Sequence, residues 1–377
     1  MTGKERFLTA MMNQQSDMVP VCPDIGQQVV LKMKGRPFWD SYYYNDPELW
    51  QVYLEALKYF KFDGRFYYKG LDYVTDSQVK TERHVIKSDG NCMTVQTVHH
   101  TPAGDLDQEI VYFRDQAPAV TRGFIKDISA DLEKYKYLFP KIVSYSDKSF
   151  RAMYDEIGDL GAVCMSIQVP GFHNWESIFN GGLPSVVYAE ADYPEHIEEL
   201  CRMQTEYIKQ QIDCIMQARP DYIYLGSSGM LTLSSLEQVR KYCLPLVQYA
   251  CAQAKKYNLP SMLHACGKSK ALAGLFAEET DLNMINPLEA PPMGDAVLSE
   301  IKKLYGSKLA LSGNILTTDV MLRGTPAQVK EACRKAIEDA GAGGGFALMT
   351  GDQCGRDTPE ENIFAFVEAG RKYGRYN

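Results

Sequence analysis

The stretch from residue 221 to residue 266 contains DYIYLG (221–226), SLEQVRKYCLPLVQYACAQAKKY (235–257) and PSMLHAC (260–266). The two short segments are apolar runs typical of buried strands, and the long segment has apolar residues at helical spacing. A strand, a helix and another strand in this order predict two parallel strands joined by a crossover helix.

The same alternation extends along the chain in both directions. Helices are predicted at 194–218 and 325–341, and other strands at VPVCPD (19–24), DGRFYY (63–68), AVCMSIQ (162–168), LNMINPL (282–288), KLALSGN (308–314) and GFALMTG (345–351). About eight parallel strands joined by helices close into a barrel. We therefore predict the α/β fold class, as a (β/α)8 TIM barrel.

Two Thr-Pro pairs predict where helices begin. Thr325-Pro326 and Thr358-Pro359 each place a capping hydroxyl before a proline at the first helical position. The strands are expected to end just upstream of these pairs.

Residues 78–125 break the alternation. VKTERHVIKS, CMTVQTVHHTP and EIVYFR alternate polar with apolar residues and are separated by the turn sequences Ser88-Asp89-Gly90 and Ala103-Gly104-Asp105. This pattern predicts an antiparallel β element inserted in the barrel. No flexible linker stands out, so we expect residues 1–377 to form one domain.

Composition excludes several classes of protein. A formal net charge of -8 argues against a nucleic-acid partner, which requires a basic face. No apolar run approaches the roughly 20 residues needed to span a bilayer, so we expect no membrane insertion. The opening MTGKERFLTAMM lacks the apolar core of a secretory signal. We therefore expect a cytoplasmic protein with reduced thiols.

The segment His264-Ala265-Cys266-Gly267 ends one predicted strand, and Cys354 follows another, 88 residues after Cys266. Side chains two apart in an extended segment point to the same side, so His264 and Cys266 are suited to hold one ion. With Cys354 they form a nitrogen and sulfur set that suits Zn²⁺ and leaves a fourth position open, as in catalytic sites. The alternative is that the cysteines are ordinary buried apolar residues.

Other polar residues also lie at predicted strand ends, where barrel enzymes keep their active sites. Asp24, Gln168, Ser227 and, near one strand end, His173 are the candidates for substrate binding. Glu289 and Asn314 are the candidates for catalysis, and Glu289 is also a candidate fourth zinc ligand. The alternatives are a turn former for Asp24, a solvated loop charge for Glu289 and a helix cap for Asn314.

Several segments carry a family resemblance. They are KERFLTAMMNQQSDMVPV, LHACGK, NPLEAPPMGD, LALSGNI, RGTPAQVKEACRKAIEDAG and GGGFALMTGDQCGRDTPEENIFAFVEAGRKYG. The chain resembles the uroporphyrinogen decarboxylase superfamily, in its zinc-dependent, corrinoid-linked methyltransferase branch. The resemblance implies a (β/α)8 barrel in which His264, Cys266 and Cys354 bind zinc. It also implies methyl transfer to or from cobalamin.

The chain departs from the decarboxylases of this superfamily in one segment. Those enzymes carry Arg-Gln-Ala-Gly-Arg-Tyr after the first strand to bind the carboxylates of a porphyrinogen, whereas residues 23–28 read Pro-Asp-Ile-Gly-Gln-Gln. The absence of arginine counts against tetrapyrrole decarboxylation. No corrinoid-binding Asp-X-His-X-X-Gly signature occurs either, so the cobalamin is expected to come from a separate corrinoid protein.

Within the methyltransferase branch, the inserted β element and the tyrosine-rich segments 38–46 and 65–70 favour an O-demethylase acting on a methoxylated aromatic. The alternatives are a methylcobalamin:thiol methyltransferase of the coenzyme M type, a decarboxylase, and a non-catalytic binding protein. The methyl donor, the direction of transfer and a homodimer stay open at this point.

Overall fold

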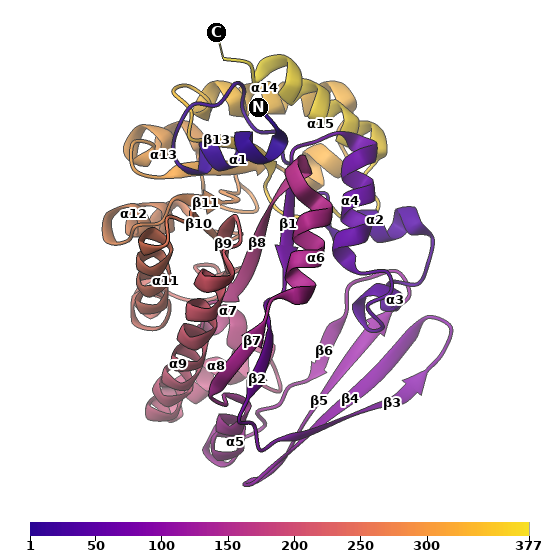
Figure 1. The fold of residues 1–377 in the computed structure, drawn as a ribbon, viewed down its shortest axis with the longest axis vertical. Coiled ribbons are helices and arrows are strands. Elements are labelled where there is room, and N and C mark those ends of the chain that lie inside the picture. The colour runs from indigo at the N-terminus through magenta and orange to yellow at the C-terminus, as the bar shows by residue number, and fades with distance from the viewer. Residues whose placement is uncertain (377) are drawn as a thin grey trace.

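The computed structural model describes residues 1–376 and is built around a curled parallel sheet (Figure 1). Its seven strands lie in the order β1-β8-β9-β10-β11-β12-β13, and each pairs in parallel with its neighbour. The strands are β1 (Gly64–Tyr68), β8 (Gly161–Gln168), β9 (Tyr222–Gly226), β10 (Ser261–His264), β11 (Met284–Asn286), β12 (Ala310–Ile315) and β13 (Phe346–Thr350). The predicted (β/α)8 fold class is confirmed.

An extended segment joins the two ends of this sheet. Val21 forms a parallel bridge with Leu348 of β13, and its carbonyl accepts a hydrogen bond from the Asp63 N–H, just before β1, at 2.8 Å. The prediction of a full strand at 19–24 is wrong, because only a bridge forms. Pro20 and Pro23 have no N–H to donate to a ladder, so regular pairing cannot extend through them.

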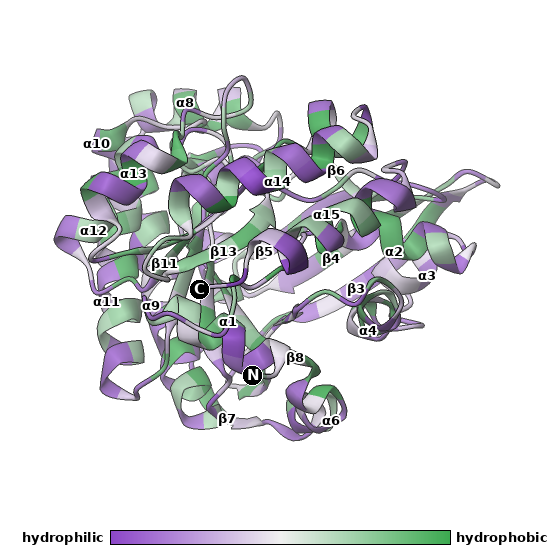
Figure 2. Cartoon of the chain, turned by 90° about the horizontal axis from the view of Figure 1, so that it is seen from above, coloured by the Kyte–Doolittle hydropathy of each residue, from purple (hydrophilic) through white to green (hydrophobic). Residues whose placement is uncertain are grey.

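Helices follow the strands and cover the outside of the sheet. The longer ones are α1 (Gly3–Met11), α2 (Gly26–Lys34), α4 (Leu49–Phe60), α5 (Ile128–Tyr135), α6 (Lys148–Ile157), α8 (Leu183–Asp192), α9 (Pro194–Ala218), α11 (Leu244–Lys256), α12 (Lys270–Glu279), α13 (Leu298–Tyr305), α14 (Pro326–Ala340) and α15 (Glu360–Tyr373). The short α-helices are α3 (Phe38–Tyr42), α7 (Phe172–Trp175) and α10 (Leu236–Gln238). Short 3-10 and π-helical segments are η1 (Lys136–Leu138), η2 (Gly158–Leu160), η3 (Val239–Cys243) and η4 (Thr317–Leu322). In α14 the buried residues recur at helical spacing, and Figure 2 shows both polar and apolar residues along this helix.

The barrel interior is filled by small and sulfur-containing side chains. The buried cluster consists of Cys22, Ala162, Cys164, Tyr222, Met262, Met284, Ala310, Ala347 and Met349, with Phe7 and Met11 of α1. Helix α1 also contacts residues 158–160, which precede β8, so it covers the N-terminal ends of the strands. The opposite end, where the strands finish, is the one left for a site.

The predicted insertion forms a separate antiparallel sheet in the order β3-β4-β5-β6 (Figure 1). Its strands are β3 (Lys80–Ser88), β4 (Cys92–Thr101), β5 (Gly104–Phe113) and β6 (Ala119–Arg122). Two strands that the sequence analysis did not foresee, β2 (Asp72–Thr75) and β7 (Ile142–Ser146), pair with each other. The Phe38 N–H of α3 donates to the Arg114 carbonyl at 2.8 Å, which ties one end of the insertion to the barrel.

No helix within residues 1–376 combines the length and the apolar character needed to cross a membrane.

Candidate functional site

A cavity of about 350 Å³ lies at the C-terminal ends of the barrel strands. Five of the predicted site residues line it together, namely Asp24, Gln168, His173, Ser227 and His264, and Asp352 lines it as well. They come from separate strand ends, so the fold brings distant parts of the sequence to one place. The clustering at one mouth follows from parallel strands, whose carboxyl ends all meet at the same edge.

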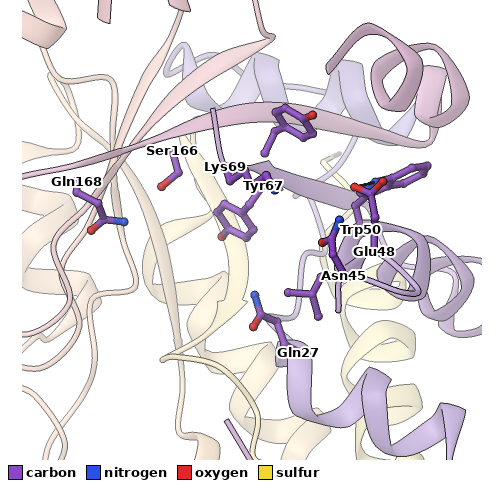
Figure 3. Close-up of a pocket in the computed structure, with 10 residues that line it drawn as sticks. Gln27, Asn45, Glu48, Trp50, Tyr67, Lys69, Ser166 and Gln168 are labelled. Atoms are coloured by element: carbon purple, nitrogen blue, oxygen red, sulfur yellow. Dashed lines mark hydrogen bonds between the residues drawn. The ribbon is translucent and has the colours of Figure 1, made fainter. Parts of the chain in front are cut away.

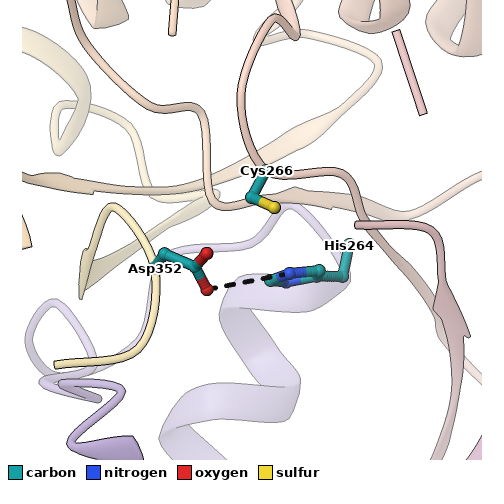
Figure 4. Close-up of side chains that lie close together, drawn as sticks. All are labelled: His264, Cys266 and Asp352. Atoms are coloured by element: carbon teal, nitrogen blue, oxygen red, sulfur yellow. Dashed lines mark ion pairs between the residues drawn. The ribbon is translucent and has the colours of Figure 1, made fainter. Parts of the chain in front are cut away.

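His264, Cys266 and Asp352 form a compact group in which all potential ligand atoms lie within 4.8 Å of one another (Figure 4). His264 is the last residue of β10, Cys266 lies in the turn that follows, and Asp352 lies in the loop after β13. His264 Nε2 is 4.0 Å from Asp352 Oδ1. One nitrogen, one sulfur and one carboxylate at this spacing are a donor set that fits a zinc ion.

The imidazole of His264 is oriented by a hydrogen bond on its far side. Nδ1 lies 2.7 Å from Asn286 Oδ1 at the end of β11, and Asn286 Nδ2 is 3.3 Å from Ser312 Oγ of β12. With Nδ1 engaged, Nε2 faces Asp352 and Cys266. A metal-binding histidine is usually held by such a second hydrogen bond, so the arrangement supports the fit.

The turn after His264 is shaped by Gly267 and Glu289. Gly267 has a φ of +81°, and a side chain there would place its Cβ 2.1 Å from Thr232 Oγ1. The Gly267 N–H donates to the carboxylate of Glu289, which is 5% exposed. Burial raises the pKa of Glu289 and raises that of the Cys266 thiol to about 12. Glu289 therefore contacts the backbone next to Cys266 and is not part of the compact group.

Cys354 lies two residues beyond Asp352 in the same loop. Its side chain is buried, and its N–H donates to the Asp24 carbonyl at 2.8 Å. The compact group contains Asp352 in the place that the sequence analysis gave to Cys354. The role of Cys354 as a zinc ligand stays a prediction.

Asp24 is a buried carboxylate with a buried cation beside it. Arg65 of β1 places Nη2 3.4 Å from Asp24 Oδ2, and the Gly26 N–H donates to Asp24 Oδ1 at 3.2 Å. Burial raises the pKa of Asp24, and the positive charge of Arg65 opposes that shift. Arg65 itself is 2% exposed, and its Nε has no hydrogen-bond partner among residues 1–376.

Among the residues that line the cavity, His173 and Ser227 are two with polar atoms that the described part of the chain leaves without partners. These atoms are Ser227 Oγ and both ring nitrogens of His173. Burial lowers the pKa of His173 to about 4, so its ring is neutral near pH 7. Buried polar atoms usually have partners, and these two residues are therefore suited to hydrogen bond with a ligand in the cavity.

Asn314 is placed elsewhere. It lines a different cavity of about 320 Å³, together with Val297, Leu298, Val320 and Ala332 from the region of α13 and α14. The structure therefore does not bring Asn314 to the mouth with His264, and its catalytic role stays a prediction.

Three residues near the site were not foreseen. They are Asp352, Arg65, and Tyr224, whose ring centroid is 5.7 Å from that of His264. Asp352 had a detectable signal, because it directly follows the predicted strand 345–351. Arg65 and Tyr224 lie within predicted strands, where sequence gives no sign that they point into the barrel.

Comparison with known proteins identifies the family. The family model described as Uroporphyrinogen decarboxylase (URO-D) matches residues 179–373, which is more than half of the chain. The chain belongs to the uroporphyrinogen decarboxylase family. The matched region contains His264, Cys266, Asp352 and Cys354, so all four lie in the part that defines membership.

Curated members of the family match over short segments. Uroporphyrinogen decarboxylase of Actinobacillus succinogenes is 33% identical over 78 residues, which cover 21% of this chain and 22% of that protein. The enzyme of the same name from Pseudoalteromonas translucida is 32% identical over 76 residues, which cover 20% of this chain and 21% of that protein. The matches thus span about a fifth of each relative's length.

A solved structure matches over the whole length. A methyltransferase from Methanosarcina mazei superimposes with a TM-score of 0.67 at 18% identity, and the match covers 99% of each chain. At that identity the likeness shows a shared fold. The shared fold extends over the whole of both chains.

Proposed function

We propose that this URO-D family member is a zinc-dependent methyltransferase that moves a methyl group between a small substrate and the cobalamin of a separate corrinoid protein. The observation that carries this proposal is the group of His264, Cys266 and Asp352, with His264 oriented by Asn286, at the mouth cavity. A metal site with an open cavity beside it is the arrangement of a catalytic site rather than a structural one.

The zinc would be held by His264 and Cys266, with Cys354, as predicted from the sequence, or Asp352 as the third ligand. Two thiolates and one imidazole form a softer set than one thiolate, one imidazole and one carboxylate, and zinc accepts both. The alternative third ligand is Asp352, which the geometry favours because its carboxylate is already 4.0 Å from His264 Nε2. Cys354→Ser and Asp352→Asn separate the two, since only the true ligand's variant loses zinc affinity.

When bound, zinc would act as a Lewis acid on the oxygen or sulfur of the substrate. Side chains near the proposed zinc site have distinct roles. Glu289 holds the turn that carries Cys266, Asn286 fixes the His264 ring, and Arg65 keeps a positive charge next to Asp24. The neutral His173 and Ser227 have unpaired polar atoms to offer to a substrate in the cavity. The methyl group is then presented at the open mouth, where a partner protein has access.

Decarboxylation of a polyanionic tetrapyrrole fits the cavity less well. Its wall has two carboxylates, Asp24 and Asp352, and no lysine or arginine among the lining residues of the described chain. The nearby Arg65 is buried and already pairs with Asp24. A substrate with many carboxylates would meet repulsion rather than a set of bidentate partners.

The substrate is proposed to be a methoxylated aromatic, as the tyrosine-rich segments favour. The test is methyl transfer from a panel of methoxybenzenes to a reduced corrinoid protein, followed by the absorbance of the cobalamin. Transfer from a methoxybenzene supports an O-demethylase. Transfer that occurs only to or from a small thiol supports the coenzyme M type of enzyme instead, and loss of carbon dioxide from a porphyrinogen without any methyl transfer contradicts the proposal.

A further inference from the structure

A second cavity of about 340 Å³ is lined by the residues drawn in Figure 3. We call it the side chamber, and define it by Asn45, Glu48, Leu49, Trp50, Tyr68 and Lys69. The two cavities share Gln27, Tyr67, Ser166 and Gln168 in their linings, so they are neighbouring parts of one space. A ligand of extended shape can therefore reach from His264 into the side chamber.

Aromatic rings lie between His264 at the mouth and the side chamber. The ring centroid of Tyr224 is 5.7 Å from that of His264 and 4.7 Å from that of Tyr67, which lines both cavities. Tyr67 Oη is buried without a hydrogen-bond partner in the described chain. The passage from the mouth to the side chamber thus has aromatic rings in its wall, together with the polar side chains of Gln27, Ser166 and Gln168.

The side chamber has two charged residues, Glu48 and Lys69, and they differ in whether another side chain already contacts the charged group. Glu48 accepts a hydrogen bond from the indole of Trp50 at 3.0 Å and lies at the N-terminus of α4, where a carboxylate is stabilised by the helix dipole. Lys69 is exposed, and no carboxylate oxygen within residues 1–376 lies within 4.0 Å of its ammonium group. Lys69 is therefore a cation of the chamber without an ion-pair partner in the described chain, whereas Glu48 keeps its negative charge with one oxygen engaged by Trp50.

We propose that the side chamber binds the non-reacting end of the substrate, and that this end carries an anionic group, such as a carboxylate, paired with Lys69. The body of the substrate packs against Trp50 and Leu49, and its methyl-bearing end faces His264. This inference rests on the proposed function for placing the methyl group at the metal end. Lys69 is then a specificity-determining residue for the proposed reaction.

Calorimetric titration of the zinc-loaded full chain tests the proposal. Without corrinoid protein no methyl transfer takes place, so the titration measures substrate binding alone. The two probes are 4-methoxybenzoate and its uncharged analogue 4-methoxybenzamide. An ion pair with an exposed lysine is weakened by solvent screening, so we expect the carboxylate to bind about two- to fivefold more tightly than the amide. Lys69→Gln should bring the two affinities together, and Lys69→Arg should restore most of the difference.

The matched control is Lys58→Gln, which removes the same charge from the exposed end of α4 and does not line the chamber. It should retain the preference for the carboxylate. Equal binding of the two probes by the natural chain, binding of neither, or a preference that survives Lys69→Gln would each overturn the proposal. The last result would indicate that zinc, rather than Lys69, binds the carboxylate.

Failure of this inference is distinguishable from failure of the proposed function. If the carboxylate binds through Lys69 but no methyl group moves to a corrinoid, the side chamber is confirmed and the methyltransferase proposal is wrong. If methyl transfer proceeds equally from charged and uncharged methoxybenzenes, the methyltransferase proposal stands and the role of Lys69 is wrong.

Discussion

His264 depends on a single partner for its orientation. Asn286 Oδ1 lies 2.7 Å from Nδ1, which leaves Nε2 as the ring atom that faces Cys266 and Asp352. The contact with His264 requires only that the side chain at position 286 has an oxygen that accepts a hydrogen bond. The amide nitrogen of Asn286 is not required for this contact.

Asn286→Leu removes the acceptor, and we expect zinc affinity to fall roughly 10- to 100-fold, the usual cost of losing such a partner. Asn286→Asp keeps an acceptor oxygen and should retain most of the affinity. Competition with a chromophoric chelator measures both. Equal affinities for the natural chain and Asn286→Leu would mean that the hydrogen bond does not position the ring.

His173 provides a pH prediction. Burial lowers its pKa from 6.5 to about 4, so between these values the unfolded chain binds a proton that the folded chain does not. The free energy of unfolding therefore falls as the pH drops from about 6.5 to about 4, by up to roughly 3 kcal/mol for this group. Urea unfolding at pH 7 and pH 5 measures the change, and His173→Gln should reduce it. An unchanged pH dependence in the variant would contradict the assignment.

The sequence predicted which residue types form the site more successfully than it predicted which of those residues lie close together. Asp24, Gln168, His173, Ser227 and His264 were expected at one mouth and line one cavity, because strand ends are visible as the end of an apolar run. Asn314 was expected there for the same reason and lines another cavity. The direction in which a side chain points at the end of a strand depends on the local backbone conformation. That conformation cannot be predicted from a single sequence.

At the level of elements, periodicity located the seven strands of the barrel sheet to within two residues at each end, whereas 19–24 forms only the bridge at Val21. In the insertion, β5 begins at Gly104, five residues before the predicted EIVYFR, and β2 and β7 were not predicted. The segment around Val21 does not form a full strand because Pro20 and Pro23 interrupt pairing. The prediction of a cap at Thr325 is confirmed, since its side chain accepts a hydrogen bond from the Gln328 N–H. The prediction at Thr358 is wrong, because α15 begins at Glu360 with Pro359 as its cap and Thr358 Oγ1 has no partner in the described chain.

Thr325→Ala should therefore lower the free energy of unfolding by about 1 kcal/mol, since α14 loses the hydroxyl that caps its first turn. Thr325→Ser retains the hydroxyl and should differ little from the natural chain. Chemical denaturation measures both variants. A loss of the same size in both would show that the methyl group, and not the cap, is responsible.

At the level of the whole molecule, Asp63 links both ends of the chain to the barrel. Its carboxylate accepts hydrogen bonds from Arg6 at 2.7 Å, from Arg371 at 2.8 Å and from the Val21 N–H at 2.8 Å. Its side chain is 3% exposed. These contacts lie at the N-terminal end of the strands, away from the mouth, and the residue is therefore expected to serve stability.

Asp63→Ala leaves two arginines without their buried partner and should lower the free energy of unfolding by about 3 to 5 kcal/mol. Asp17→Ala removes a carboxylate that also pairs with Arg6 but is 40% exposed, and it should cost less than about 1 kcal/mol. Unfolding in urea compares the two, with zinc content unchanged in the folded protein. Similar losses for both variants would contradict the role given to Asp63.

The metal site is the central claim, and metal content tests it most directly. Elemental analysis of the purified chain, beside His264→Ala and Cys266→Ser, should find about one zinc per natural chain and almost none in either variant, with the variants folded as judged by their unfolding transitions. A natural chain that fails to take up zinc when it is added, or variants that hold zinc as tightly as the natural chain, would contradict the account.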